Sequence, residues 1–182
     1  MKLFLGIICT LIGVVLFCDG CKKYPSDPFI SFQSPYARLI GSNWHITSYQ
    51  INGVEHSHDF DSMLTPRTLT DCNMIFGAYS SSSSPHGVVD FKYNDGTSIT
   101  VDGKSISGSN LFTYTFRDNS STVLDFYNTG VNSRTDSSFY SLFFKTITFP
   151  PPRNYSYWSV IELFQGKLHL RDGTTDLYCS KL

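Results

Sequence analysis

The chain has 182 residues, a formal net charge of −1, and 41% hydrophobic residues against 16% charged ones. This composition excludes a disordered chain, because it offers enough apolar surface for a packed core. The balanced charge, without a long run of Lys or Arg, also argues against a nucleic-acid partner.

The N-terminal residues 1–20 are typical of a signal peptide. Lys2 supplies a short positive region, and residues 3–17 are apolar and uncharged. Asp19 and Gly20 interrupt this run before it reaches the roughly 20 apolar residues that a spanning helix needs. We therefore expect residues 1–20 to be removed on export rather than kept as a membrane helix.

The end of this segment resembles a bacterial lipoprotein signal, in which a small residue precedes the Cys that receives the lipid. Gly20 and Cys21 fit this pattern, whereas Cys18 does not, because the bulky Phe17 precedes it. Lipid on Cys21 would hold the exported protein to the outer membrane, on its periplasmic or its outer side. The alternative is ordinary cleavage and secretion of a soluble domain.

The mature chain divides into a short leader and one domain. Residues 21–37 are the expected lipidated N-terminus and flexible tether. Within them we expect residues 22–28 to stay extended rather than join the core, because this stretch is polar and contains Pro25 and Pro28. Residues 38–182 have the length of a single domain and show no internal repeat.

Two cysteines, Cys72 and Cys179, remain after removal of the signal and lipidation of Cys21. In an oxidising compartment they could pair, and a bridge that closes so long a loop would stabilise the fold by about 4 to 5 kcal/mol. The alternative is two buried free thiols, since the sequence does not give the Cα separation that a bridge requires.

Short apolar segments between turn signals predict an all-β protein. The expected strands are residues 44–51, 73–79, 88–93, 98–101, 112–116, 122–127, 139–149, 157–164 and 167–172. In the first, strict alternation puts Trp44 and Ile46 on one face, and Tyr49 and Ile51 on the other. The one helix candidate, residues 59–69, contains a Pro, so we expect a single turn or an irregular crossover.

The number and spacing of these strands favour an antiparallel barrel of about eight strands, with a two-sheet β-sandwich as the alternative. The segment RLIGSNWHITSYQINGVE, residues 38–55, resembles the first strand of the lipocalin-like domain of small bacterial lipoproteins. The run SVIELFQGKLHLRD, residues 159–172, resembles the closing hairpin of that family. The resemblance implies an up-and-down barrel.

The interior of such a barrel holds one small apolar ligand or is filled by its own side chains. The residues that would line a ligand pocket are Trp44, Tyr114, Phe116, Phe126 and Phe144. The same aromatic residues could instead fill the core. In the family an Arg packs across the Trp, and by position the candidate here is Arg171 over Trp44.

The sequence contains few candidates for chemistry. His56, His58, Asp59 and Asp61 have the spacing of metal ligands, but we expect a polar loop and no metal or cofactor. The segment Asp61-Ser62-Met63 resembles an O-glycosylation acceptor, although it also fits a chance occurrence. Tyr155, Tyr157 and Trp158 could be exposed for binding sugar or protein, or buried in the barrel.

Three functional classes follow from these patterns. The first is a lipoprotein that binds a small apolar ligand in its barrel. The second is a non-catalytic structural or interaction lipoprotein of the cell envelope, which binds a protein or glycan and has a filled barrel. The third, an enzyme, is not expected, because no nucleophile, acid–base pair or phosphate loop is evident in the sequence.

Overall fold

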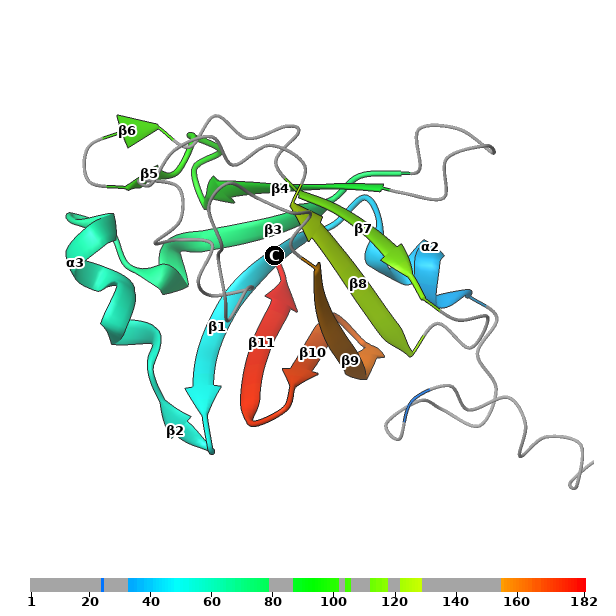
Figure 1. Cartoon of the computed structure of the whole chain (residues 1–182). Coiled ribbons are helices and arrows are strands. Elements are labelled where there is room, and N and C mark those ends of the chain that lie inside the picture. The colour runs from blue at the N-terminus through cyan, green and yellow to red at the C-terminus, as the bar shows by residue number, and fades with distance from the viewer. Residues whose placement is uncertain are drawn as a thin grey trace, which may run out of the picture.

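A computed structural model describes residues 24, 33–78, 87–101, 104–105, 112–117, 122–128 and 155–182. Its main feature is a closed, antiparallel barrel (Figure 1). In order of pairing, the eight barrel strands are β1 (Asn43–Ile51), β3 (Cys72–Phe76), β4 (Gly87–Tyr93), β7 (Phe112–Phe116), β8 (Val123–Asn128), β9 (Tyr155–Phe164), β10 (Lys167–Asp172) and β11 (Thr175–Lys181). The predicted all-β barrel is confirmed, and the two-sheet sandwich is excluded.

Several short helices and strands lie outside the eight barrel strands. They are the helix α2 (Pro35–Leu39), the strands β2 (Val54–Glu55), β5 (Thr100–Val101) and β6 (Lys104–Ser105), and the helical turns η2 (Ser57–Phe60), α3 (Asp61–Leu64) and η3 (Leu69–Asp71). The three helical turns lie within or beside the segment for which we predicted an irregular crossover, and that prediction is confirmed.

The barrel closes through β11, which no expected strand covered. β11 pairs with β10 on one side and with β1 on the other, so the resemblance to a closing hairpin at residues 159–172 placed the closure one strand too early. The expected strand at residues 98–101 was to pair with residues 88–93, and it does so only through one bridge, between Ser98 and Lys92, because Thr100 and Val101 form β5, which pairs with β6. The expected strand at 139–149 lies outside the described residues.

A β-bulge changes the faces of β1. Trp44 and Ile46 face the interior, the register then shifts between Ile46 and Ser48, and Tyr49 pairs with the inward-facing Leu177. Tyr49 and Ile51 therefore share the face of Trp44, whereas strict alternation had put them on the opposite face. One extra residue reverses the phase of every side chain after it.

The two ends of the barrel differ. At the end that we call the α2 end, β1 begins, β9 meets β10 through the turn Gln165–Gly166, and β11 ends. At the opposite end, which we call the mouth, β1 ends and β3 begins, joined by residues 52–71, and β4 ends and β7 begins. Figure 1 shows α2 and α3 on opposite sides of the barrel.

Helix α2 packs against the barrel. Ser34 caps its start by accepting a hydrogen bond from the Ala37 amide at 3.1 Å, and Leu39 is fully buried. Tyr24 is also buried, with 2% of its surface exposed, and it belongs to the core cluster. Tyr24 was expected in an extended stretch that stays apart from the core, and here it joins the core.

Candidate functional site in the barrel

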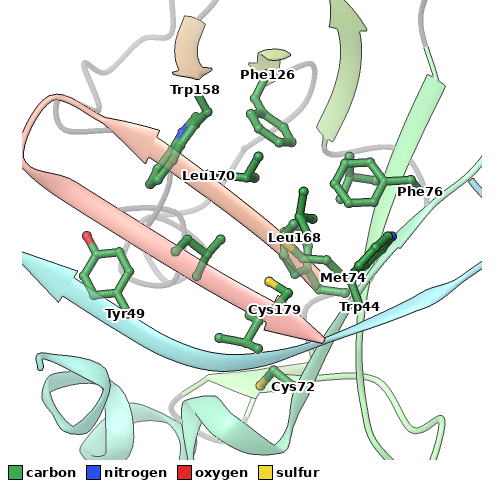
Figure 2. Packing of buried hydrophobic residues seen from close by; sticks show 14 of the residues in the cluster. Trp44, Tyr49, Cys72, Met74, Phe76, Phe126, Trp158, Leu168, Leu170 and Cys179 are labelled. Atoms are coloured by element: carbon green, nitrogen blue, oxygen red, sulfur yellow. The ribbon is translucent and has the colours of Figure 1, made fainter. Parts of the chain in front are cut away.

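Large aromatic side chains occupy the barrel interior (Figure 2). They are Trp44, Phe76, Tyr114, Phe126 and Trp158, each with no more than 1% of its surface exposed. The ring of Phe76 contacts Tyr114 edge to face, with centroids 5.1 Å apart, and lies 6.3 Å from the ring of Phe126. Aromatic pairs at these distances stabilise a core beyond the area that they bury.

The predicted pocket residues are in different places. Tyr114 and Phe126 meet around Phe76, as part of the packed interior. Phe116 is partly buried against the same cluster. Trp44 pairs with Met74, two residues before Phe76 on β3, toward the α2 end, and the fifth candidate, Phe144, lies outside the described residues.

Aliphatic side chains complete the interior. Leu124, Leu163, Leu168, Leu170 and Leu177 each have no more than 1% of their surface exposed. A side chain buried to this degree has protein atoms, rather than a water-sized space, on every side. The side chains described here therefore pack directly against one another or against neighbouring parts of the chain.

Trp44 has two polar contacts at the α2 end. Its indole nitrogen donates a hydrogen bond to the Leu39 carbonyl at 2.8 Å, which ties β1 to helix α2. The ammonium of Lys181 lies 5.1 Å from the centre of its ring, within cation–π range. The predicted cation, Arg171, is the wrong residue, because the register of β11 opposite β1 puts Lys181 beside Trp44.

Arg171 has a different role on the outer wall. Its Nε donates to Asp176 Oδ1 at 2.7 Å, and His169 Nε2 lies 2.6 Å from the same oxygen. His169 also stacks on Tyr178, with ring centroids 4.2 Å apart. Burial acts to raise the pKa of Asp176, but the hydrogen bonds from Arg171 and His169 outweigh it and lower that pKa. This network joins β10 to β11.

Tyr114 packs closely against the backbone of a neighbouring strand. Its hydroxyl donates to the Gly77 carbonyl at 2.9 Å, and its ring lies directly over Gly87. A Cβ atom on Gly87 would lie 2.3 Å from Tyr114 Cε1 and 2.8 Å from the Gly77 oxygen. The absence of a side chain at residue 87 is therefore what lets this ring enter the core.

The crossover segment η2–α3 covers part of the mouth. Phe60 contacts Tyr49 edge to face, with ring centroids 5.4 Å apart, and Leu64 is fully buried. Burial raises the pKa of Tyr49, although a hydrogen bond with Thr175 acts against the shift. Tyr49 thus stays neutral and belongs to the packed interior.

Glu55 attaches this cover to β1. Its carboxylate accepts hydrogen bonds from the hydroxyl groups of Ser48 and Ser57 and from the amides of Tyr49 and Ser57. Burial acts to raise the pKa of Glu55, but these hydrogen bonds lower it to about 2. The ionised carboxylate holds β2, the bulge of β1 and the start of η2 together.

The two cysteines are free and buried. Cys179 lies on β11 opposite Ile46 of β1, and Cys72 lies on the other neighbour of β1, next to Asn73, which pairs with His45. The strand β1 therefore separates the two cysteines, and two strand spacings of about 4.8 Å exceed the Cα separation that a bridge allows, which accounts for two separate thiols, the second of the two alternatives. Burial raises the pKa of Cys72 to about 12 and raises that of Cys179 as well.

The residues with metal-ligand spacing form two separate pairs. His56 Nδ1 lies 2.7 Å from Asp59, and His58 Nδ1 lies 3.0 Å from Asp61. The hydrogen bond with Asp61 raises the pKa of His58. Within the part of the chain that the structure describes, no three His, Cys, Asp or Glu residues converge on a metal position.

The aromatic residues after the proline run separate by strand alternation. Trp158 points into the barrel and donates from its indole nitrogen to Ser156 Oγ at 2.8 Å. Tyr157 points outward, with 44% of its surface exposed, and the guanidinium of Arg117 lies 4.3 Å from its ring centre. Only Tyr157 of these two is therefore available to a partner.

Phe76 and Trp158 are central to the core. The sequence did not assign Phe76 there, and it left Trp158 open between exposure and burial in the barrel. The alternation of Met74 with Phe76, and of Ser156 with Trp158, was the signal that could have found them.

None of the helices among the described residues has the length and hydropathy to cross a membrane.

Comparison with known proteins gives little further information. No protein-family model matches the chain, and no curated protein matches it either. Among solved structures, the chain is similar to an uncharacterized protein from Bacteroides eggerthii DSM 20697. The two share 12% identity with a TM-score of 0.37, over 78% of this chain and 98% of the other. The resemblance to lipocalin-like lipoproteins therefore stays a prediction.

Proposed function

We propose that this protein is a non-catalytic lipoprotein of the cell envelope, held to the membrane by lipid on Cys21. Its barrel is a filled scaffold, and it binds a protein or glycan partner through the loops at the mouth. The observation that carries this proposal is the packed interior, in which five large aromatic side chains have almost no exposed surface.

Because the interior is filled, we expect the binding site to lie on the outer surface of the barrel. A drug-sized ligand needs a concave site of roughly 300 Å³ or more, and the packed side chains around Phe76 provide no such space beside them. The prediction of an apolar ligand among Tyr114 and Phe126 would require these rings to separate. The packing favours the interaction class over the ligand-binding class.

The mouth is the better candidate for the binding surface. Long loops on a rigid scaffold are where binding residues concentrate, and residues 52–71 connect β1 to β3 at the mouth, where β4 also ends and β7 begins. Asp59 and Asp95 are exposed there, together with the polar side chain of His58. A partner with a polar or basic surface would complement them.

The test is photocrosslinking in cells that express the full chain. A photoreactive residue at His58 or Thr174, both exposed at the mouth, should give a discrete crosslinked product. The matched control carries the same group at Ala37, exposed on α2. Crosslinks from Ala37 alone, or from none of the three positions, would contradict a binding surface at the mouth.

The proposed lipid on Cys21 requires a separate test. Labelling with radioactive palmitate should mark the wild-type chain and leave Cys21→Ser unlabelled. Equal incorporation into both chains would exclude Cys21 as the lipid site. Fractionation of the same cells should place the wild-type chain with the outer membrane and release Cys21→Ser into the soluble fraction.

A further inference from the structure

Tyr24 connects the N-terminal segment to one particular end of the barrel. The Arg38 guanidinium lies 5.8 Å from the ring centre of Tyr24. Arg38 also donates from Nη1 to the Leu163 carbonyl at 2.7 Å, near the point where β9 ends. Both contacts are at the α2 end, so Tyr24 is held at that end of the barrel.

Only two residues separate Tyr24 from Cys21. An extended chain spans at most about 3.6 Å per residue, so Cys21 lies within roughly 11 Å of Tyr24. The strands are longer than this reach, since the ten residues of β9 extend about 33 Å along the strand. A lipid on Cys21 therefore cannot bring the mouth to the membrane while Tyr24 remains in its place.

The charges among the described residues differ between the two ends. The α2 end presents the exposed cations Arg117, Lys167 and Lys181, with the carboxylate of Asp125 beside Arg117 and Glu162 half-buried on β9. The mouth carries mainly carboxylates, which are Glu55, Asp59, Asp61, Asp71, Asp95 and Asp172, together with the cation Arg67, which pairs with Asp95. Anionic lipid headgroups attract Lys and Arg near the membrane surface and repel carboxylates.

We propose that the α2 end of the barrel is a membrane-docking surface that rests on anionic lipid headgroups, so that the mouth points away from the bilayer. The inference rests on the proposed lipid at Cys21 for the tether, and on the cations of the α2 end for the contact itself. It gives the loops at the mouth free access to a partner that is not in the same membrane leaflet.

The test measures how close each end lies to the bilayer. The acylated full-length protein is placed in vesicles of phosphatidylcholine and phosphatidylglycerol that contain a lipid with a spin-labelled headgroup. A fluorophore is attached at Ala37→Cys on α2 or at Thr174→Cys at the mouth, both exposed positions. Cys72 and Cys179 are buried and should not react with the dye.

We expect the lipid quencher to reduce the fluorescence at residue 37 several-fold more than at residue 174. Equal quenching at the two positions, or stronger quenching at residue 174, would overturn the proposed orientation. Tyr24→Ala should reduce the difference, because the longer free tether allows the barrel to rotate.

A charge reversal tests the headgroup contact. Lys167→Glu should weaken quenching at residue 37 in vesicles with phosphatidylglycerol, and leave it unchanged in phosphatidylcholine alone. Lys92→Glu makes the same charge change on the outer wall of β4 and should have no effect. If Lys167→Glu behaves like Lys92→Glu, the electrostatic contact is refuted.

A chain without lipid on Cys21 can be distinguished from a chain whose α2 end does not contact the bilayer. The mass of the N-terminal peptide shows directly whether Cys21 carries lipid. If Cys21 is unmodified, the anchor is refuted, and the Cys21→Ser chain, in which Cys21 cannot take the dye, still tests the surface on phosphatidylglycerol vesicles. Preferential quenching at residue 37 then supports docking by the α2 end, and its absence refutes it.

Discussion

Substitution of Gly87 by Ala tests the packed interior at its closest contact. The new methyl group would lie 2.3 Å from Tyr114 Cε1, 2.6 Å from its Cζ and 2.8 Å from the Gly77 carbonyl oxygen. All three separations are far below an ordinary van der Waals contact, and two of the three atoms belong to a ring that is fully buried. The ring must therefore shift.

The size of the effect follows from two contributions. Overpacking a close-packed core costs typically 1 to 3 kcal/mol. A shifted ring also weakens the hydrogen bond from the Tyr114 hydroxyl to Gly77, which contributes about 1 kcal/mol. We expect Gly87→Ala to lower the free energy of unfolding by about 2 to 4 kcal/mol, a large share of the roughly 5 to 15 kcal/mol of a typical domain.

The assay is urea unfolding followed by tryptophan fluorescence, since Trp44 and Trp158 are both buried. Gly77→Ala is the matched control, because a Cβ there meets nothing closer than the Val88 oxygen at 3.5 Å. The control should change stability by less than about 0.5 kcal/mol. If Gly87→Ala has an effect as small as the control, the ring does not pack against this backbone and the account of the interior is wrong.

Three further predictions concern the periphery. Glu55 has a pKa below its ordinary value of 4.5, so its contribution to stability should be complete above that pH and disappear as the pH falls towards about 2. Glu55→Gln should flatten this part of the stability profile measured by urea unfolding, and an unchanged slope would contradict the role assigned to it. Cys72 and Cys179 should resist iodoacetamide at pH 8 in the native protein and react fully in denaturant, and an added reductant should change nothing. Lys181→Gln should change the fluorescence of Trp44 and lower stability by about 0.5 kcal/mol, whereas an unaltered spectrum would show that the ammonium does not contact the ring.

The barrel was predictable from the sequence because each hairpin carries a local signal. The β9–β10 hairpin follows from two apolar runs across Gln165 and Gly166, and the residues of this turn have positive φ as such a turn requires. The β7–β8 hairpin follows from the alternation around Tyr114. These features depend on residues close together in the chain.

The errors came from features without a local signal. The bulge after Ile46 adds one residue to β1, and nothing about Thr47 distinguishes it from a regular strand residue. β11 was missed because Asp176 and Lys181 make the segment look polar, although Asp176 is satisfied by side chains of the neighbouring strand. Such pairings become visible only when the strands are placed side by side.

The candidate site was harder to predict than the fold. Alternation showed that Tyr114 and Phe126 would face the interior, but not whether they would line a space or fill it. That depends on the ring of Phe76, on the close approach at Gly87 and on Trp158, which lie far apart in the sequence. The partner of Trp44 likewise depended on the register of β11.

The central claim is that the barrel is filled by its own side chains and works through its outer surface. It is tested most directly by native mass spectrometry of the full chain, extracted from the membrane of the cells that produce it. The account predicts the same protein mass under native and denaturing conditions, with no bound small molecule. An apolar molecule that is retained in the native protein and released on denaturation would contradict it.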